Sequence, residues 1–159
     1  MGRPTALAAL CVFLAACGGG VDQQKFDAVY KAGTALQTEV QSSGTTTRPE
    51  ARDRLKEFDT AIEALRDRTI GIREADTLKA YADAADAYRY FFRFRALEPE
   101  EGTTQILLKG PNIELATRYK LPVDTRSGAK YVNRAQAITI LLQAAEQHLN
   151  DGNRILHGR

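Results

Sequence analysis

The sequence predicts an all-α protein, a four-helix up-down bundle with a long irregular capping connection before its last helix. In four segments of the 159-residue chain, apolar residues recur at three- and four-residue steps, the spacing that places them on one face of an α-helix. The segments have similar lengths, roughly 30–37 Å at the α-helical rise, and the first two connections between them are short. Helices of equal length joined by short connections are typical of an up-down bundle.

The first two helices are predicted over roughly residues 22–42 and 47–68. The apolar face of the first is formed by Phe26, Val29 or Tyr30, Gly33, Leu36 and Val40. In the second, Thr47 and Glu50 have the spacing of a capping box, which would satisfy free amides at the start of the helix. Its apolar face is formed by Ala51, Leu55, Phe58, Ile62 and Leu65, and most of the remaining positions are charged.

The other two long helices are predicted over about residues 73–97 and 130–151. Their apolar faces are formed by Leu78, Tyr81, Ala85, Tyr88 and Phe92 in the third helix, and by Tyr131, Ala135, Ile138, Leu142, Ala145 and Leu149 in the fourth. The capping connection, about residues 98–129, contains turn-forming residues at Pro99, Gly102, Gly110-Pro111 and Pro122. We expect it to be irregular except for one short helix from Asn112, as N-cap, to about Lys120.

The beginning of the chain has the features of an export signal. Arg3 gives a basic start, and residues 6–16 form an uncharged, mostly aliphatic run, too short to span a bilayer core that needs about 20 apolar residues. The run ends in Leu14-Ala15-Ala16-Cys17, which resembles the lipobox of bacterial lipoproteins. The resemblance implies that residues 1–16 are a cleaved signal peptide, that Cys17 carries the lipid, and that its acyl chains hold the protein at a membrane.

The residues after the lipobox favour a tethered, exported domain. Residues 17–21 hold the lipidated cysteine and a glycine tether, and residues 22–159 are long enough to form a single helical domain. Gly18 stands where inner-membrane lipoproteins of enteric bacteria tend to have Asp. The resemblance therefore favours the periplasmic face of the outer membrane in a bacterium that has one.

Charge and cysteine content exclude two classes of protein. Loss of residues 1–16 removes only Arg3, so the formal net charge falls from +2 to +1. A nearly neutral exported domain has no electrostatic basis for binding nucleic acid. Cys11 lies in the signal and Cys17 is the lipid acceptor, so the mature domain has no cysteine pair for a disulfide and depends on its own core.

The segment YRYFFRFR, residues 88–95, concentrates aromatic rings and arginines near the end of the third predicted helix. On a helical wheel its rings cover an arc of roughly 200°, wider than the stripe of about 100° that one packing partner covers. One interpretation is a core that the capping connection covers on a second side. The alternatives are a membrane-contacting face and a docking surface for a protein partner, with Tyr90, Arg93 and Phe94 as the candidate docking residues.

No group of residues in the sequence identifies a reaction. His148 and His157 have no partner at metal-ligand spacing, and we predict neither a metal site nor a cofactor. Asp76, Asp83 and Asp86 share one face of the third helix and form the candidate site for a cation or a small ligand. A solvated charged face is the ordinary explanation of such a row.

These features predict a membrane-anchored lipoprotein of the cell envelope whose helical domain binds or scaffolds an envelope protein. The alternative is an envelope enzyme or small-ligand carrier that uses the face of Asp76, Asp83 and Asp86, or a pocket beneath the capping connection. The sequence favours binding over catalysis. If Tyr90 and Phe94 dock a partner, replacing both by Ser should leave the thermal stability nearly intact.

Overall fold

The structure, a computed structural model, describes residues 20–42, 49–69 and 71–158, so Cys17, Thr47 and the predicted signal peptide lie outside the described residues. In chain order the elements are α1 (Gln23–Ser42), α2 (Pro49–Arg66), α3 (Ile72–Ala96), β1 (Gln105–Leu107), α4 (Pro111–Arg118), β2 (Val123–Arg126), β3 (Ala129–Asn133) and α5 (Arg134–Leu156). The protein is mostly helical, as predicted. In these three ranges no helix combines the length and the apolar character needed to cross a membrane.

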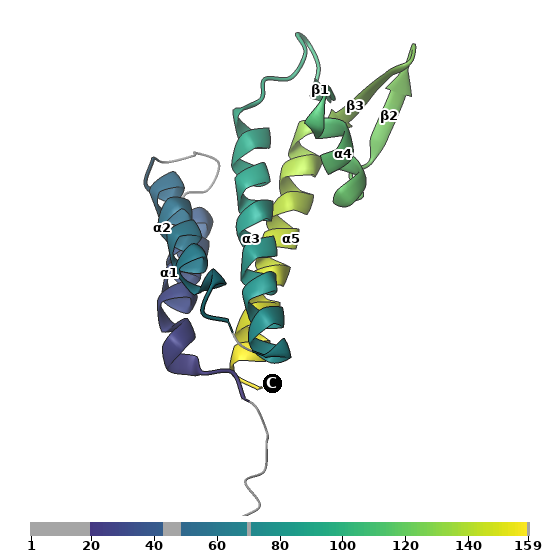
Figure 1. The fold of residues 1–159 in the computed structure, drawn as a ribbon. Coiled ribbons are helices and arrows are strands. Elements are labelled where there is room, and N and C mark those ends of the chain that lie inside the picture. The colour runs from purple at the N-terminus through teal and green to yellow at the C-terminus, as the bar shows by residue number, and fades with distance from the viewer. Residues whose placement is uncertain (1–19, 43–48, 70, 159) are drawn as a thin grey trace, which may run out of the picture.

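The long helices lie in two pairs, α1 beside α2 and α3 beside α5 (Figure 1). The chain runs up α1, down α2, up α3 and, after the smaller elements, down α5, so the start of α1 and the end of α5 lie together at the base. Residues 98–133, which include α4 and the three strands, gather at the opposite end of α3 and α5. We call residues 98–133 the cap.

The apolar faces predicted for α1 and α2 are their buried faces. The buried residues are Phe26, Val29, Gly33, Leu36 and Val40 in α1, and Ala51, Leu55, Phe58, Ile62 and Leu65 in α2. At Gly33 a Cβ atom would lie 2.7 Å from Leu149 Cδ1 and 3.0 Å from Phe58 Cε2. Because glycine has no side chain, α1 can approach both α2 and α5 at this position.

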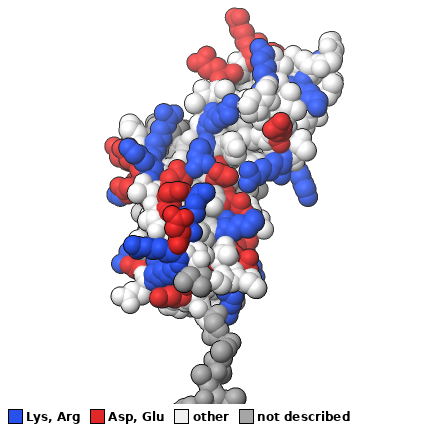
Figure 2. All heavy atoms as spheres, in the orientation of Figure 1, with Lys and Arg blue, Asp and Glu red and all other residues white. Residues whose placement is uncertain are grey.

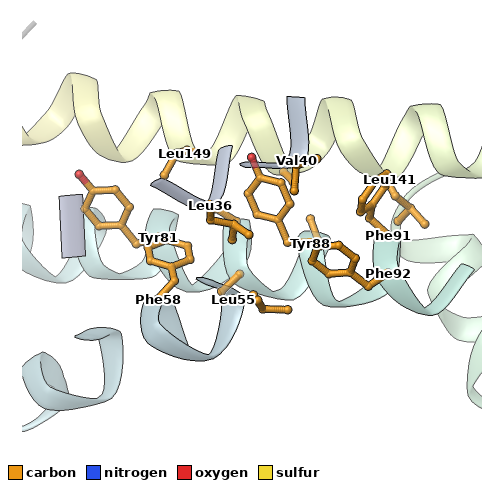
Figure 3. Close-up of a cluster of buried hydrophobic side chains, with 14 of the residues drawn as sticks. Leu36, Val40, Leu55, Phe58, Tyr81, Tyr88, Phe91, Phe92, Leu141 and Leu149 are labelled. Carbon is orange, nitrogen blue, oxygen red and sulfur yellow. The ribbon is translucent and has the colours of Figure 1, made fainter. Parts of the chain in front are cut away.

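Helix α3 is buried on more than one side, as the wide arc of its aromatic rings indicates. Its buried residues include Tyr81, Ala84, Ala85, Ala87, Tyr88, Phe91, Phe92 and Phe94. In Figure 3, Tyr81 and Tyr88 lie between α3 and α5, near Leu149 of α5. The ring centroid of Tyr81 is 6.1 Å from that of Phe58 in α2 and 6.5 Å from that of Phe26 in α1.

The hydroxyl groups of the two buried tyrosines differ in their hydrogen bonding. Tyr81 Oη donates to Asn153 Oδ1 at 2.8 Å, whereas the buried Tyr88 Oη has no hydrogen-bond partner among the described residues. Burial raises the pKa of both phenols well above the usual range, so both are neutral at physiological pH. A buried hydroxyl without a partner carries a desolvation cost that a bonded hydroxyl avoids.

We therefore expect opposite results from the same substitution at the two positions. Tyr88→Phe should leave the free energy of unfolding unchanged or raise it by up to about 1 kcal/mol, because it removes an unbonded polar atom. Tyr81→Phe should lower it by about 1 kcal/mol, because Asn153 loses its donor. Urea denaturation of the two variants and the wild type measures both changes. Equal losses would contradict the difference between the two hydroxyls.

The prediction that the capping connection is irregular is wrong, because part of it forms strands. The all-α prediction is therefore incomplete. The cap contains a three-stranded antiparallel sheet in the order β1-β3-β2. Val132, in the central strand β3, is the register partner of Ile106 in β1 and of Val123 in β2. The β2–β3 hairpin turns at Ser127 and Gly128, which have φ values of 50° and 79°. Two consecutive residues with positive φ match the right-handed twist of a hairpin.

The predicted short helix is present as α4, but its start differs from the prediction. Gly110 is the N-cap residue, and Asn112, predicted as the cap, is buried within the helix. Pro111 explains the earlier start, because proline is favoured in the first turn, where its missing N–H has no helical partner. The side chain of Asn112 is therefore not available for capping.

The last long helix begins later than predicted and buries a different face. Residues 129–133 form β3, and α5 begins at Arg134, with the Asn133 side chain accepting a hydrogen bond from Gln136 N at 3.0 Å. The buried face of α5 consists of Ala137, Leu141, Ala145, Leu149, Gly152 and Leu156. Of the predicted face, only Ala145 and Leu149 are buried here. Ala135, Ile138 and Leu142 form an adjoining second apolar stripe, which is exposed or half-buried.

Candidate functional site

A cavity of about 440 Å³ lies beside the cap, at the C-terminal end of α3 and the N-terminal end of α5. We call it the cap cavity. Its apolar wall is formed by Val40, Phe91, Pro99, Ala135, Ile138 and Leu142. Its polar lining consists of Arg95, Arg134 and three threonines, Thr103, Thr104 and Thr139. A mostly apolar cavity of about 300–1,000 Å³ with a few polar groups is typical of a small-molecule site.

The second apolar stripe of α5 forms one wall of the cap cavity. Ala135, Ile138 and Leu142 recur at three- and four-residue steps, so they project from one side of the helix. This side adjoins the buried face without belonging to it. The stripe thus explains why α5 carries more apolar residues than its packing against α3 requires.

Hydrogen bonds fix the cap residues at the rim of the cavity. Arg134 N donates to Thr104 O at 2.9 Å, and Asn133 Nδ2 donates to Thr104 Oγ1 at 3.0 Å. A turn closes the neighbouring loop, because Thr103 N donates to Glu100 O at 3.0 Å. The start of α5 and the loop that precedes β1 therefore hold each other in place.

Two guanidinium groups line the cap cavity. Arg134 donates from Nη2 to the carbonyl oxygen of Arg95, while its Nε is buried and has no hydrogen-bond partner among the described residues. The guanidinium carbon of Arg95 is 5.4 Å from the centre of the Phe91 ring, within the range of a cation–π contact. Burial lowers the pKa of Arg95, and the positive charge of Arg134 lowers it further.

The arrangement favours binding of an anion over acid–base chemistry. Guanidinium groups stay protonated and only donate hydrogen bonds, so they attract carboxylate or phosphate oxygens. Among the described residues, the lining includes no carboxylate, histidine, cysteine or lysine that could act as a general acid, base or activated nucleophile.

The three predicted docking residues differ in their exposure to solvent. Phe94 is fully buried, so it cannot contact a partner in this fold, and its prediction as a docking residue is wrong. Tyr90 is half-buried, with its ring centroid 5.9 Å from that of Tyr119 in the cap. Arg93 is exposed. The cap lies against this side of α3, where Tyr119 meets Tyr90 and Arg118 pairs with Asp83 and Asp86.

The structure brings Asp83 and Asp86 together but leaves Asp76 apart. Both paired carboxylates face Arg118 of α4, at 3.4 Å from Asp83 and 3.6 Å from Asp86. Lys79 Nζ is 2.5 Å from Asp83 Oδ2, and Arg89 joins Asp86 to Asp59 of α2. Asp76 is exposed, about 10 Å along the helix from Asp83.

These contacts form an ion-paired surface that connects α2, α3 and α4. Figure 2 shows acidic and basic side chains interspersed over the helices on the face in view. Within the described ranges, no three histidine, cysteine, aspartate or glutamate side chains are grouped so that they could hold a metal ion. His157 contacts the Tyr30 ring edge-on at 5.4 Å, near the base of the molecule. Cys17 lies outside the described residues.

The cavity lining includes residues that the sequence analysis did not single out. Arg134 was not predicted as a site residue, because its sequence context does not distinguish it from any other cationic residue on the surface of a predicted helix. The available signal was the width of the apolar arc of the last helix, which includes both Leu141 and Leu142. No family model, curated protein sequence or solved structure matches this chain, so its function is inferred from the site itself.

Proposed function

We propose that the protein is a lipoprotein of the cell envelope, anchored through Cys17, whose helical domain binds a small ligand in the cap cavity. The observation that supports ligand binding is the cavity itself, with about 440 Å³ of space, an apolar wall and two guanidinium groups. The lipobox Leu14-Ala15-Ala16-Cys17 supports the anchor. Ligand binding replaces protein docking as the leading hypothesis because Phe94 is buried.

The position of the cavity suits a domain held at a membrane by its N-terminus. Gly20 and Val21 lie beside Ile155 to Gly158 at the base of the molecule, whereas the cavity is at the opposite end of α3 and α5. We propose that the four long helices act together as a four-helix bundle, a stalk between anchor and cavity. The 25 residues of α3 give this stalk a length of roughly 37 Å.

If the cap cavity binds a ligand, the protein should co-purify with a small molecule. A bulky side chain introduced into the cavity should exclude that molecule. Full-length protein is extracted from membranes and analysed by native mass spectrometry. We expect a bound species on the wild type and a loss of about tenfold or more in its occupancy in Ala135→Trp, because indole would fill the space beside the stripe.

The matched control is Gln143→Trp, at an exposed position of α5 outside the cavity lining. This variant should keep the bound species, and circular dichroism should show that both variants retain their helices. A wild-type protein free of any small molecule, or a species that Ala135→Trp retains in full, would contradict ligand binding in the cap cavity.

A second candidate function is docking of an envelope protein on the cap. The observation that favours it is β2, an edge strand whose four residues, Val123–Arg126, are all exposed. An exposed edge offers unpaired backbone groups to an extended segment of another protein. Cross-linking from β2 in cells, compared with cross-linking from the exposed residue Gln143, distinguishes this candidate from ligand binding.

A further inference from the structure

We infer that the cap cavity takes an amphiphilic anion, with its acidic group at Arg95 and Arg134 and its apolar chain along the second apolar stripe of α5. The inference rests on the proposed ligand-binding function and names the chemical class of the ligand. The acidic group is a carboxylate or a phosphate monoester, because a guanidinium fork pairs with either.

Two guanidinium groups, those of Arg95 and Arg134, line the polar end of the cavity. Arg134 Nε is buried without a hydrogen-bond partner among the described residues, and an unbonded buried donor on a charged group is costly. Arg95 lies close enough that the two positive charges repel each other, which contributes to the lowered pKa of Arg95. A ligand acid between Arg95 and Arg134 would accept charge-assisted hydrogen bonds from these guanidinium groups and reduce the repulsion between them.

The helix that carries Arg134 adds to the positive potential at this end. Arg134 is the first residue of α5, where the N-terminal end of the helix dipole is partially positive. Negative charge is therefore favoured at the same end of the cavity by three groups, the two side chains and the start of the helix. A cationic ligand would be repelled by all three.

The remainder of the cavity is apolar and extends along the helix. From Arg134 to Leu142 the axis of α5 advances by roughly 12 Å, and Ile138 lies between them on the same stripe. Val40, Phe91 and Pro99 add apolar side chains from other parts of the chain to the lining. An apolar chain that covers these side chains would remove them from water, which is favourable.

This division between a cationic end and an apolar remainder disfavours other ligand classes. A sugar or a short peptide has polar groups along its whole length, and the stripe offers them no hydrogen bonds. A neutral lipid would fill the apolar part but bring no negative charge to the two guanidinium groups. An amphiphile with a single terminal acid satisfies both ends.

The class of ligand is tested with four probes of equal chain length and different head groups. The full-length lipidated protein, reconstituted in phosphatidylcholine vesicles, is titrated calorimetrically with octanoate, octyl phosphate, octanol and octyltrimethylammonium, with protein-free vesicles as the blank. We expect at least one of the two anions to bind about tenfold tighter than octanol or more, because charge-assisted hydrogen bonds are stronger than neutral ones. The cation should not bind measurably.

Two variants locate the head group. Arg134→Met keeps the length of the side chain, and should weaken anion binding about tenfold while octanol affinity changes less than about twofold. Arg95→Met should also weaken anion binding. It provides a second test if Arg134→Met does not fold. Arg93→Met, at an exposed position outside the cavity, is the matched control and should bind all probes as the wild type does.

The possible results separate this inference from the proposed function. Equal affinity for the anions and octanol would overturn the anion specificity and leave a neutral apolar site. No binding of any probe, together with a different small molecule in the native mass spectrum, would overturn the amphiphile and retain ligand binding. No probe binding and no co-purified molecule would overturn both. Preference for octanoate over octyl phosphate, or the reverse, identifies the acid.

Discussion

Replacing Phe94 by alanine is expected to lower the free energy of unfolding by about 3–5 kcal/mol, a large part of the stability of a domain of this size. The side chain is fully buried, so the substitution removes a whole ring from the core and leaves a cavity. Phe94 belongs to the same cluster of buried residues as Ile106, Leu115 and Val132 of the cap. Loss of the ring should therefore loosen the cap as well as α3. Guanidinium chloride denaturation measures the change.

The neighbouring residue gives a matched control for Phe94→Ala. Arg93 is adjacent in α3 but exposed, and Arg93→Ala should change the stability by no more than about 0.5 kcal/mol. The expectation reverses the one drawn from docking, in which loss of Phe94 leaves the stability nearly intact. A loss below about 1 kcal/mol for Phe94→Ala would contradict the full burial of this ring in the core.

For the aromatic stretch, residues 88–95, the helical wheel predicts how many sides of the helix are covered but not which rings are buried. The width of its arc indicated correctly that α3 needs cover on two sides, and residues 98–133 supply the second cover. The wheel did not show which rings are covered. Phe94 and Tyr90 fall on the same adjoining face, but only Phe94 is fully buried while Tyr90 meets Tyr119 at the edge of the cap.

The helices and the strands differ in how strongly the sequence specifies them. In α1 and α2 each apolar face has five buried residues over several turns, enough to fix the period. The three strands have 3–5 residues each, too short for alternation to be distinguished from a helical step. Residues 129–133 are extended because β3 pairs with strands on both sides, a long-range effect that local periodicity does not contain.

The cap cavity could not be predicted from local sequence patterns, for a related reason. Its lining comes from Val40, Phe91, the 99–104 loop and the start of α5, which are distant in sequence and meet only in the folded chain. The apolar side chains of Ile138 and Leu142 were visible in the sequence but assigned to the core. Once Leu141 occupies the core position, a helix cannot also bury Leu142 there, because successive residues are about 100° apart. An excess of apolar residues on a helix is thus a signal of a second contact.

Substitution of Cys17 by serine is expected to abolish attachment of lipid. A serine hydroxyl has no sulfur to form the thioether that the lipobox resemblance implies. Each buried methylene contributes about 0.8 kcal/mol to membrane binding, and stable anchoring takes at least two acyl chains. Cells grown with a labelled fatty acid should incorporate label into the wild-type protein and none into Cys17→Ser.

Cys11→Ser is the matched control, because it shows whether loss of lipid follows from losing Cys17 in particular or from losing any cysteine. Cys11 lies within the apolar run of the predicted signal, so Cys11→Ser should incorporate label as the wild type does, and its N-terminal peptide should start at the acylated Cys17. In Cys17→Ser the same peptide should lack any acyl mass, whether or not the signal is cleaved. Because the cap cavity lies at the far end of the helices from residue 20, occupancy of its ligand should depend on the anchor only through access to the membrane. A label that persists in Cys17→Ser would place the anchor elsewhere in the chain and leave the cavity unaffected.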